Sequence, residues 1–479
     1  MNKNIFKHIL VGCALVMSTS SCSDWLDVQP NSQVKSSELF KTESGFKEAL
    51  AGVYTLLTDE TIYGKELTYG MMGVLSHEWI NFPTSYTDDA AYNYTATLSQ
   101  GRIENIWSKM YNAISNTNYL LENIENANVF KANNKDIIKG EALALRALIH
   151  FDLLRCFGVN YSTNPNQPAI PYITDYSAKQ SKQLTVSQVI ENVIKDLNDA
   201  KALLKNDPIY TGKSITEIDD NGYLMNRSLH MNYYAAEALL ARVYLYINDY
   251  EKAKTAAQIV ISSNKFKFTN SDDFTSGLDK LGATEQIFGL QINNLDQRNT
   301  NYLSQEGTNT FSVDAESMSS YLNNNTDDYR YFLYERGTLN NSINNYYVTK
   351  YAELRDDLIS SVSNPSYYQN KLPIIKLPEM YLILAEAKWK LNESALANYN
   401  TYLNSRGIKS VASMPTDFRT VLDNEYRKEF IAEGQLFFYY KRTNKEFVTG
   451  SDVNLVNSKS YTFPIPEREL ESADRQPNK

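Results

Sequence analysis

The stretch from Gly140 to Gly158, GEALALRALIHFDLLRCFG, constrains the fold more than any other part of the chain. Its apolar side chains recur at helical spacing and form one wide stripe, which predicts a helix packed against a large surface. The stripe consists of Leu143, Leu145, Ala147, Leu148, Phe151, Leu154, Cys156 and Phe157. Four charged residues are spaced for ion pairs along the polar side of the helix: Glu141, Arg146, Asp152 and Arg155. The stretch therefore predicts a buried helix at the centre of a helical protein.

Other parts of the chain are typical of helical hairpins. Met231 to Ser263 contains two helical patterns of similar length, with Ala at the contact positions and a short turn at Asn248-Asp249. This arrangement is typical of tetratricopeptide repeats. Helix pairs are expected at 36–57 with 102–126, at 140–158 with 185–205, within 231–263, and within 377–403. An ordinary hairpin explains any single pair equally well, and the recurrence favours the repeat.

Long irregular stretches separate these helices. Residues 64–97 lack sustained periodicity and are expected to form a long loop, and the proline-rich stretch 160–182 a second one. Residues 269–372 are polar and rich in Asn and Tyr, with short alternating pieces such as Gln286 to Gln291 that predict minor strands. We therefore expect a mainly all-α fold, in which tetratricopeptide-like helix pairs form a right-handed scaffold with long irregular insertions.

The N-terminus carries a targeting signal. Lys3 and Lys7 precede an apolar run from Ile9 to Met17, and small residues then lead directly to Cys22. This order predicts a lipoprotein signal peptide over residues 1–21, with Cys22 lipidated. A membrane-spanning anchor is the alternative, but the apolar run is far shorter than the roughly 20 residues that span a bilayer.

Composition and motif content exclude several functions. The formal net charge of −9 and the lack of a basic run argue against nucleic-acid binding. After removal of the signal peptide only Cys22 and Cys156 remain, so no disulfide framework is expected. No phosphate loop, metal-ligand spacing or nucleophilic triad is present, and His77, His150 and His230 are isolated. We therefore expect a protein that is not an enzyme and has no cofactor other than the lipid on Cys22.

Four separated segments resemble signatures of the SusD/RagB family of outer-membrane nutrient-binding lipoproteins. They are 22–30, the 140–158 helix, Glu425 to Arg442, and the closing segment 461–478 with Phe463-Pro464-Ile465-Pro466 and Asn478. Gln435 stands where the family usually has histidine. The resemblance implies a single SusD-like domain over 22–479. Its helical scaffold would comprise 22–268 and 373–479, and its ligand side the insertion 269–372.

The resemblance also implies a function. Members of this family are tethered to the outer face of the outer membrane, capture an oligosaccharide, and deliver it to a SusC-like TonB-dependent transporter. We therefore expect a glycan ligand, such a transporter as partner, and membrane attachment through the lipid alone. Three rivals stay open at this stage: peptide capture as in the RagB branch, a protein-binding repeat scaffold, and a glycoside hydrolase with two opposed carboxylates.

Sugars are bound by aromatic platforms beside amide and carboxylate groups, and the 35 tyrosines supply the former. We expect the glycan site in the 64–97 loop and near 302–331. The candidate residues are Trp79, Asn81, Tyr86, Tyr92, Tyr94, Tyr302 and Tyr321. Trp79 is equally compatible with a core position, any one tyrosine with a structural role, and Asn81 with a turn. Asp88, Asp89 and Asn93 match no recognised calcium loop, so no metal site is expected.

Overall fold

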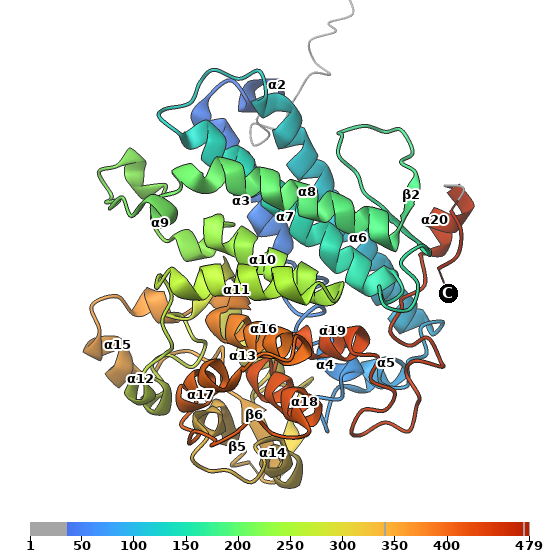
Figure 1. The fold of residues 1–479 in the computed structure, drawn as a ribbon, viewed down its shortest axis with the longest axis vertical. Coiled ribbons are helices and arrows are strands. Elements are labelled where there is room, and N and C mark those ends of the chain that lie inside the picture. The colour runs from blue at the N-terminus through green and yellow to red at the C-terminus, as the bar shows by residue number, and fades with distance from the viewer. Residues whose placement is uncertain (1–35, 340–341, 473–474, 479) are drawn as a thin grey trace, which may run out of the picture.

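The computed structural model describes residues 36–339, 342–472 and 475–478. The predicted signal peptide, Cys22 and the first of the four signatures lie outside these residues. Within them, no helix combines the length and the hydropathy needed to cross a bilayer. Most of the described chain is helical, and the helices are stacked in layers (Figure 1).

The scaffold consists of helices that pack on one another largely in chain order. They are α2 (Ser36–Leu39), α3 (Glu43–Leu57), α6 (Thr97–Ile124), α7 (Asn134–Phe157), α8 (Val186–Leu203), α10 (Tyr233–Tyr246), α11 (Tyr250–Ser262), α16 (Leu377–Lys390), α17 (Leu396–Asn404), α18 (Phe418–Glu429) and α19 (Gln435–Arg442). The succession of contacts is α3 with α6, α6 with α7, α7 with α8, α8 with α10, α10 with α11, α11 with α16, and α16 with α17. The predicted helix pairs and the mainly helical tetratricopeptide-like fold are confirmed.

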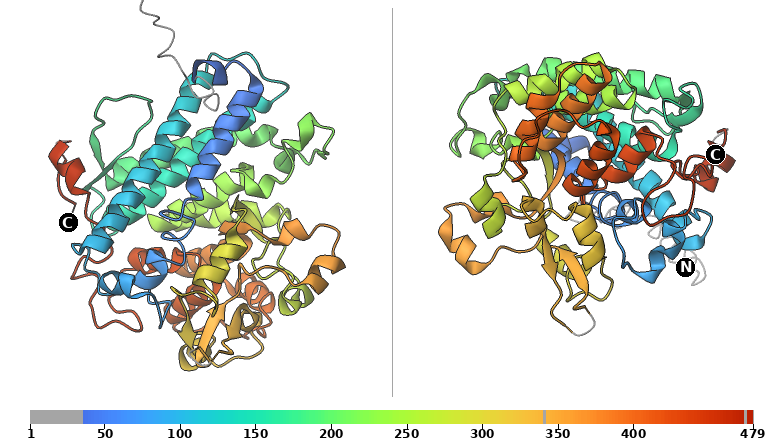
Figure 2. Two further views of the ribbon diagram at one scale, coloured as in Figure 1. Left: turned by 180° about the vertical axis from the view of Figure 1, so that it is seen from behind. Right: turned by 60° about the horizontal axis from the view of Figure 1, so that its bottom comes forward.

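The insertion leaves this array and returns to it without interrupting it. Helices α11 and α16 are in direct contact although more than one hundred residues separate them in the chain. Figure 2 shows the intervening segment, coloured yellow to light orange, gathered on one side of the scaffold.

Local sequence signals explain several helix boundaries. Thr42 separates α2 from α3, and its side chain accepts a hydrogen bond from the backbone N–H of Gly45 at 3.2 Å. Thr185 and Gln188 form a reciprocal capping box at the start of α8. The C-terminal signature is split by Gly434, which has a φ of 71° between α18 and α19.

Helix α7 is buried on nearly every side, so the expected polar side does not face solvent. Only Asp152 and Arg155 form an ion pair within the helix. Arg146 instead pairs with Asp196 of α8, with Nε–Oδ2 and Nη2–Oδ1 distances of 2.7 and 2.8 Å. Glu141 pairs with Arg227 at 2.7 Å. The polar residues therefore satisfy one another across elements, because helices cover both faces of α7.

At the C-terminal end of α7, the helix signature 140–158 contacts both C-terminal signatures, 425–442 and 461–478. The side chain of Lys441 in α19 donates a hydrogen bond to the carbonyl of Arg155 at 2.6 Å and another to that of Gly158. The backbone N–H of Phe463 donates to the carbonyl of Cys156 at 2.9 Å, and Asn478 donates to that of Phe157. These carbonyls have no partners within the helix, so the C-terminal segments cap it.

The insertion and the segments that connect the scaffold contain short elements. They are α4 (Met71–Leu75), α5 (Thr87–Ala90), β1 (Pro168–Pro171), β2 (Gln183–Thr185), α9 (Pro208–Thr211), α12 (Ser271–Ser276), β3 (Gln286–Gln291), α13 (Leu295–Tyr302), β4 (Val313–Asp314), α14 (Ala315–Tyr321), β5 (Tyr334–Arg336), β6 (Asn345–Val348), α15 (Asp356–Ser361), β7 (Lys371–Lys376) and α20 (Glu467–Ser472). All strand pairs are antiparallel: β1 with β2, β3 with β7, and β6 between β4 and β5. The predicted strand at 286–291 is confirmed.

The expectation of a long loop over residues 64–97 is wrong. The segment contains α4, α5 and a series of turns, and most of its side chains are buried. The segment lies between two scaffold helices: its helix α4 contacts α19, and its helix α5 contacts α6. Most of its backbone hydrogen bonds are made locally in tight turns, and Ile80 and Asn81 bond Ser312 of the insertion. The segment therefore packs as core without a long periodic pattern.

Candidate functional site

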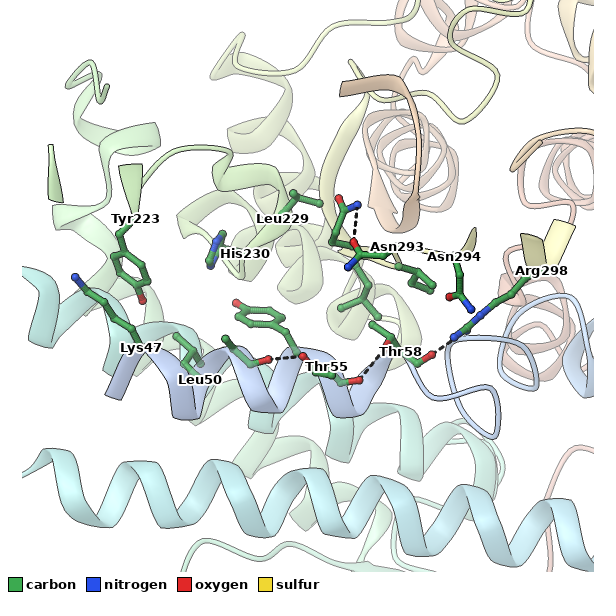
Figure 3. A pocket seen from close by; sticks show the side chains of 15 residues that line it. Lys47, Leu50, Thr55, Thr58, Tyr223, Leu229, His230, Asn293, Asn294 and Arg298 are labelled. Atoms are coloured by element: carbon green, nitrogen blue, oxygen red, sulfur yellow. Dashed lines mark hydrogen bonds between the residues drawn. The ribbon is translucent and has the colours of Figure 1, made fainter. Parts of the chain in front are cut away.

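A cavity of about 500 Å³ lies between α3, the end of strand β3 and the segment 223–230 (Figure 3). Its floor is one face of α3, on which the side chains follow helical spacing: Lys47, Leu50, Ala51, Tyr54, Thr55 and Thr58. Its opposite wall is formed by Tyr223, Leu229, His230, Leu290, Gln291, Ile292, Asn293, Asn294 and Arg298. The volume is within the range of small-molecule sites.

Glu141 of α7 holds two rings at the base of this cavity. Tyr54 donates its hydroxyl proton to Glu141 Oε2 at 2.7 Å, and His230 Nδ1 lies 2.9 Å from the same oxygen. The Tyr54 oxygen also accepts a hydrogen bond from the backbone N–H of Met231 at 2.8 Å. Burial alone would raise the pKa of Glu141, but Arg227 and His230 lower it to about 2. The carboxylate therefore stays charged and fixes both rings.

Both ends of the cavity carry a polar atom that has no hydrogen-bond partner among the described residues. One is the hydroxyl of Tyr223, whose ring lies under Lys47 Nζ at 4.3 Å from the centroid. The other is Nε of Arg298, whose Nη1 donates to the carbonyls of Thr58 and Gly64 at 2.9 and 3.3 Å. Figure 3 shows Tyr223 and Arg298 at opposite ends. A ligand bearing several hydroxyls can satisfy such separated groups.

The remaining polar groups of the wall and floor include carboxamides and hydroxyls. Asn293 and Asn294 are exposed at the end of β3. Thr55 and Thr58 donate their hydroxyl protons to helix carbonyls at 2.9 and 2.8 Å, which leaves their oxygens as acceptors. Among the described residues that line the cavity, none is Asp or Glu. The opposed carboxylates of a glycoside hydrolase are therefore not found in this lining.

Five of the seven predicted binding residues are buried and cannot serve as exposed platforms. Trp79 is 2% exposed and donates its indole N–H to the carbonyl of Tyr69 at 2.8 Å. The hydroxyls of the others bond inside the protein: Tyr86 to Glu66, Tyr92 to the Leu75 carbonyl, Tyr94 to the Ser460 carbonyl, and Tyr321 to the His77 carbonyl. Because each polar tip finds a partner, the rings are buried at little cost. The prediction of a site built on these residues is wrong in this respect.

Tyr302 and Asn81 remain accessible, and Tyr302 adjoins the cavity. It lies one helical turn after Arg298 on α13, and its hydroxyl donates to Glu60 Oε2 at 3.0 Å. Arg298 Nε lies 3.6 Å from the other oxygen of Glu60. Asn81 is exposed and forms an antiparallel bridge with Ser312, the residue after Phe311, whose N–H donates to the Tyr302 carbonyl. Tyr302 therefore lies near the Arg298 end of the cavity, and Asn81 is connected to it through residues 311–312.

The candidate metal-binding residues and Cys156 have contacts within the protein. Asp89 pairs with Arg102 at 2.6 Å, and Asn93 donates its amide to Asp88. No cluster of three His, Cys, Asp or Glu able to hold a metal occurs in the described residues. Cys156 is fully buried, and burial raises the pKa of its thiol to about 12. It is not a nucleophile.

The floor of the cavity is not among the predicted binding residues, although the sequence carries a signal for it. Apart from its apolar face, α3 has a second face on which Lys47, Ala51, Tyr54, Thr55 and Thr58 form a stripe of small and polar residues at the same spacing. The run of amides after the predicted strand, Gln291 to Asn294, was a second available signal. His230 is isolated in the sequence because its partner Glu141 is 89 residues away.

Fold and cavity together define a helical-repeat protein with a preformed cavity. A family model described as "Starch-binding associating with outer membrane" matches residues 24–245, and the SusD family model matches residues 221–477. The chain therefore belongs to the SusD family, which confirms the resemblance noted in the sequence. The family is one of non-catalytic binding proteins, in agreement with the prediction that the chain is not an enzyme.

Individual relatives agree with this assignment. The chain is 25% identical to SusD-like protein P2 of Formosa agariphila, with 97% of both chains covered. Among solved structures, a SusD superfamily protein from Bacteroides thetaiotaomicron has a TM-score of 0.69 at 23% identity, covering 91% of this chain and 100% of its own. A structure named "Laminarin binding SusD-like protein" has a TM-score of 0.67 at 21% identity, covering 91% and 99%. These structures share the fold.

Proposed function

We propose that this protein is a cell-surface lipoprotein that binds an oligosaccharide in the cavity between α3 and β3 and delivers it to a SusC-like TonB-dependent transporter. The observation that carries the proposal is the preformed cavity in a SusD family chain. This cavity combines aromatic rings, exposed amides and two polar atoms that have no hydrogen-bond partner among the described residues. Sugars present apolar C–H faces and a rim of hydroxyls, which match these groups.

Relatives favour a glycan over a peptide. One solved structure of the same fold is named a SusD-like carbohydrate binding protein, from Bacteroides vulgatus, and another is named for laminarin. The cavity is also closed on the side of α7 by the Glu141 contacts, whereas a peptide site needs an extended groove with backbone partners. Peptide capture of the RagB kind therefore remains an outcome of the test and not a second proposal.

The ligand class can be identified by calorimetry on lipid-free protein that begins at Ser23. The protein is titrated with oligosaccharides of starch and of laminarin, with other dietary and host polysaccharides, and with a mixed peptide digest. We expect saturable binding to one glycan class and no product after prolonged incubation. Binding to the digest alone would overturn the glycan proposal, and product release would overturn the non-catalytic role.

The lipid anchor is tested by replacing the predicted acylated residue. Cys22→Ala should abolish incorporation of labelled palmitate and release the protein from the membrane fraction. Cys156→Ala is the matched control, because Cys156 is buried and has no place in the signal. Labelling that survives in Cys22→Ala would contradict the anchor.

The partner is tested in the native outer membrane. Affinity purification of the tagged, lipidated protein in mild detergent should recover a TonB-dependent barrel protein in near-equal amount. Recovery of the protein free of any such barrel, across several detergents, would contradict the delivery step while leaving the binding site intact.

A further inference from the structure

A second cavity lies at the other end of α7, where the family signatures converge. It measures about 380 Å³ and is enclosed by the loop 159–167 that follows α7 and by residues 444–462, with Pro477 and Asn478 at its edge. It shares no lining residue with the cavity between α3 and β3. The two are far apart, because Glu141 and Phe157 alone are separated by about 24 Å along the helix.

More than half of the residues that line this second cavity have uncharged polar side chains. Five carboxamide side chains line it: Asn160, Asn164, Gln167, Asn444 and Asn478. The ring of Tyr461 and apolar side chains such as Leu455 contribute the remaining wall. Lys459, which is exposed, is the one charged side chain among the described lining residues. A carboxamide both donates and accepts hydrogen bonds, and so does a hydroxyl, so the lining suits a neutral hydroxylated molecule.

Two of these amides are fixed in position by the fold. Asn160 is 6% exposed, and its Nδ2 donates to the Lys441 carbonyl at 2.7 Å and to Asn444 Oδ1 at 2.8 Å. Asn478 is 4% exposed and donates to the Phe463 carbonyl at 2.9 Å. These bonds hold the amides without conformational freedom, so little entropy is lost when a ligand binds.

Asn160 also has an unused acceptor. Its Oδ1 has no hydrogen-bond partner among the described residues, although the side chain is more than nine-tenths buried. A buried acceptor without a donor is costly, and native proteins usually satisfy it. A hydroxyl at the floor of the cavity is the kind of donor that would do so.

We propose that the cavity between residues 159–167 and 444–462 is a second binding site, which takes a neutral polyhydroxylated ligand of one or two sugar units. The volume is at the lower end of the range for small-molecule sites, which limits the ligand to this size. The site works independently of the proposed function, because the two cavities have no residue in common.

Hydrogen–deuterium exchange on lipid-free protein from Ser23 tests the site. The probes are maltose, cellobiose and laminaribiose, with glucuronic acid as the charged comparison. We expect at least one neutral disaccharide to slow exchange in peptides that cover 159–167 and 444–462. Glucuronic acid should have no effect there. The absence of protection with every neutral probe, or protection by glucuronic acid alone, would overturn the proposal.

Paired variants separate this site from the first one. Asn164→Leu with Gln167→Leu removes two rim amides that bond each other at 3.2 Å and leaves the buried Asn160 and Asn478 in place. We expect this variant to lose affinity by roughly tenfold at the second site. Asn293→Ala with Asn294→Ala, at the first cavity, should leave that protection unchanged. Equal protection in the Asn164/Gln167 variant and the wild type would overturn the assignment. Changes in hydrogen exchange along α3 report on the first cavity, so they test only the proposed function.

Discussion

The helical scaffold and the insertion 269–372 differ in the arrangement of the interactions that hold them in place. In the scaffold, α10 packs through buried Ala and Leu side chains against α8, α11 and α16. A cluster of buried ion pairs attaches the insertion to α18. Arg406 Nη1 and Nη2 contact the two oxygens of Glu285 at 2.7 and 2.8 Å, and its Nε contacts Glu429 at 2.9 Å. Buried ion pairs also join scaffold helices, such as Arg242 of α10 to Glu379 of α16 at 2.6 Å. In the scaffold they accompany apolar packing between successive helices, whereas at α18 they form a connected cluster.

Further ion pairs extend this attachment. Arg330 of the insertion bonds Asp328 at 2.8 Å and Glu425 of α18 at 2.9 Å. Lys350 and Lys376 both contact Glu433 at 2.7 Å, in the segment between α18 and α19. All of these groups are buried, so each charge depends on its partner. The C-terminal signature thus serves two regions: α18 holds the insertion, and α19 caps α7.

The largest expected effect comes from breaking the ionic attachment. Arg406→Met keeps the length of the side chain but leaves the buried Glu285 and Glu429 without their cation. We expect the free energy of unfolding to fall by about 3–5 kcal/mol, measured by urea denaturation. Arg355→Met is the control, because Arg355 pairs with Asp357 on the surface and should have no measurable effect. Equal stability of the two variants would contradict the attachment.

Apolar packing in the scaffold is tested by Leu239→Ala in α10. Leu239 is fully buried, so the cavity left behind should reduce the free energy of unfolding by about 2–5 kcal/mol in the same assay.

The two variants should also differ in their pH dependence. The loss of stability in Leu239→Ala should not change with pH, whereas the loss in Arg406→Met should. Burial alone would raise the pKa of Glu429, but Arg406 and Lys376 hold it well below the ordinary value of 4.5. The stability from that pair is therefore present above about pH 4.5 and is lost as the pH falls below it. Parallel pH dependence of the two variants would contradict the comparison.

Glu78 differs from the buried carboxylates above, because it forms no ion pair with a cation among the described residues. Its Oε2 accepts a hydrogen bond from Ala432 N–H at 3.2 Å, and burial raises its pKa to about 8. Since the folded pKa lies above the ordinary value, the wild type loses stability as the pH rises from about 4.5 to 8. Glu78→Gln does not titrate, so it should gain on the order of 1–3 kcal/mol relative to wild type at pH 8.

The control for Glu78→Gln is Glu122→Gln, which changes an exposed glutamate of α6. Its stability should follow that of the wild type from pH 5 to 8 in the same denaturation series. If Glu78→Gln also follows the wild type, Glu78 is ionised in the folded protein and its burial is compensated.

The scaffold was predictable from sequence because its signals are local. The cap at Thr42, the capping box at Thr185 and the strand at 286–291 each depend on residues a few positions apart. The attachment of the insertion was not predictable, because Glu285 and Arg406 are 121 residues apart and charged residues are common throughout the chain. The same holds for the base of the first cavity, where Glu141 meets His230.

The wrong prediction for the buried binding residues also arises from contacts between residues that are distant in the sequence. An aromatic residue in an aperiodic stretch can be exposed or buried, and the outcome depends on whether its polar tip finds a partner. Trp79 and Tyr94 find backbone carbonyls, one of them 366 residues away, and are therefore core. Tyr302 remains half-buried beside the cavity, where its hydroxyl reaches Glu60.

The most direct test of the binding site is calorimetry with the oligosaccharide found in the ligand panel. Asn293→Ala with Asn294→Ala removes two exposed amides at the mouth of the cavity between α3 and β3. We expect roughly a tenfold or greater loss of affinity, because hydrogen bonds to the ligand are lost while the fold is untouched. Asn105→Ala with Asn112→Ala, on the exposed face of α6, should bind like the wild type. Wild-type affinity in the Asn293/Asn294 variant would contradict the assignment of the ligand to this cavity.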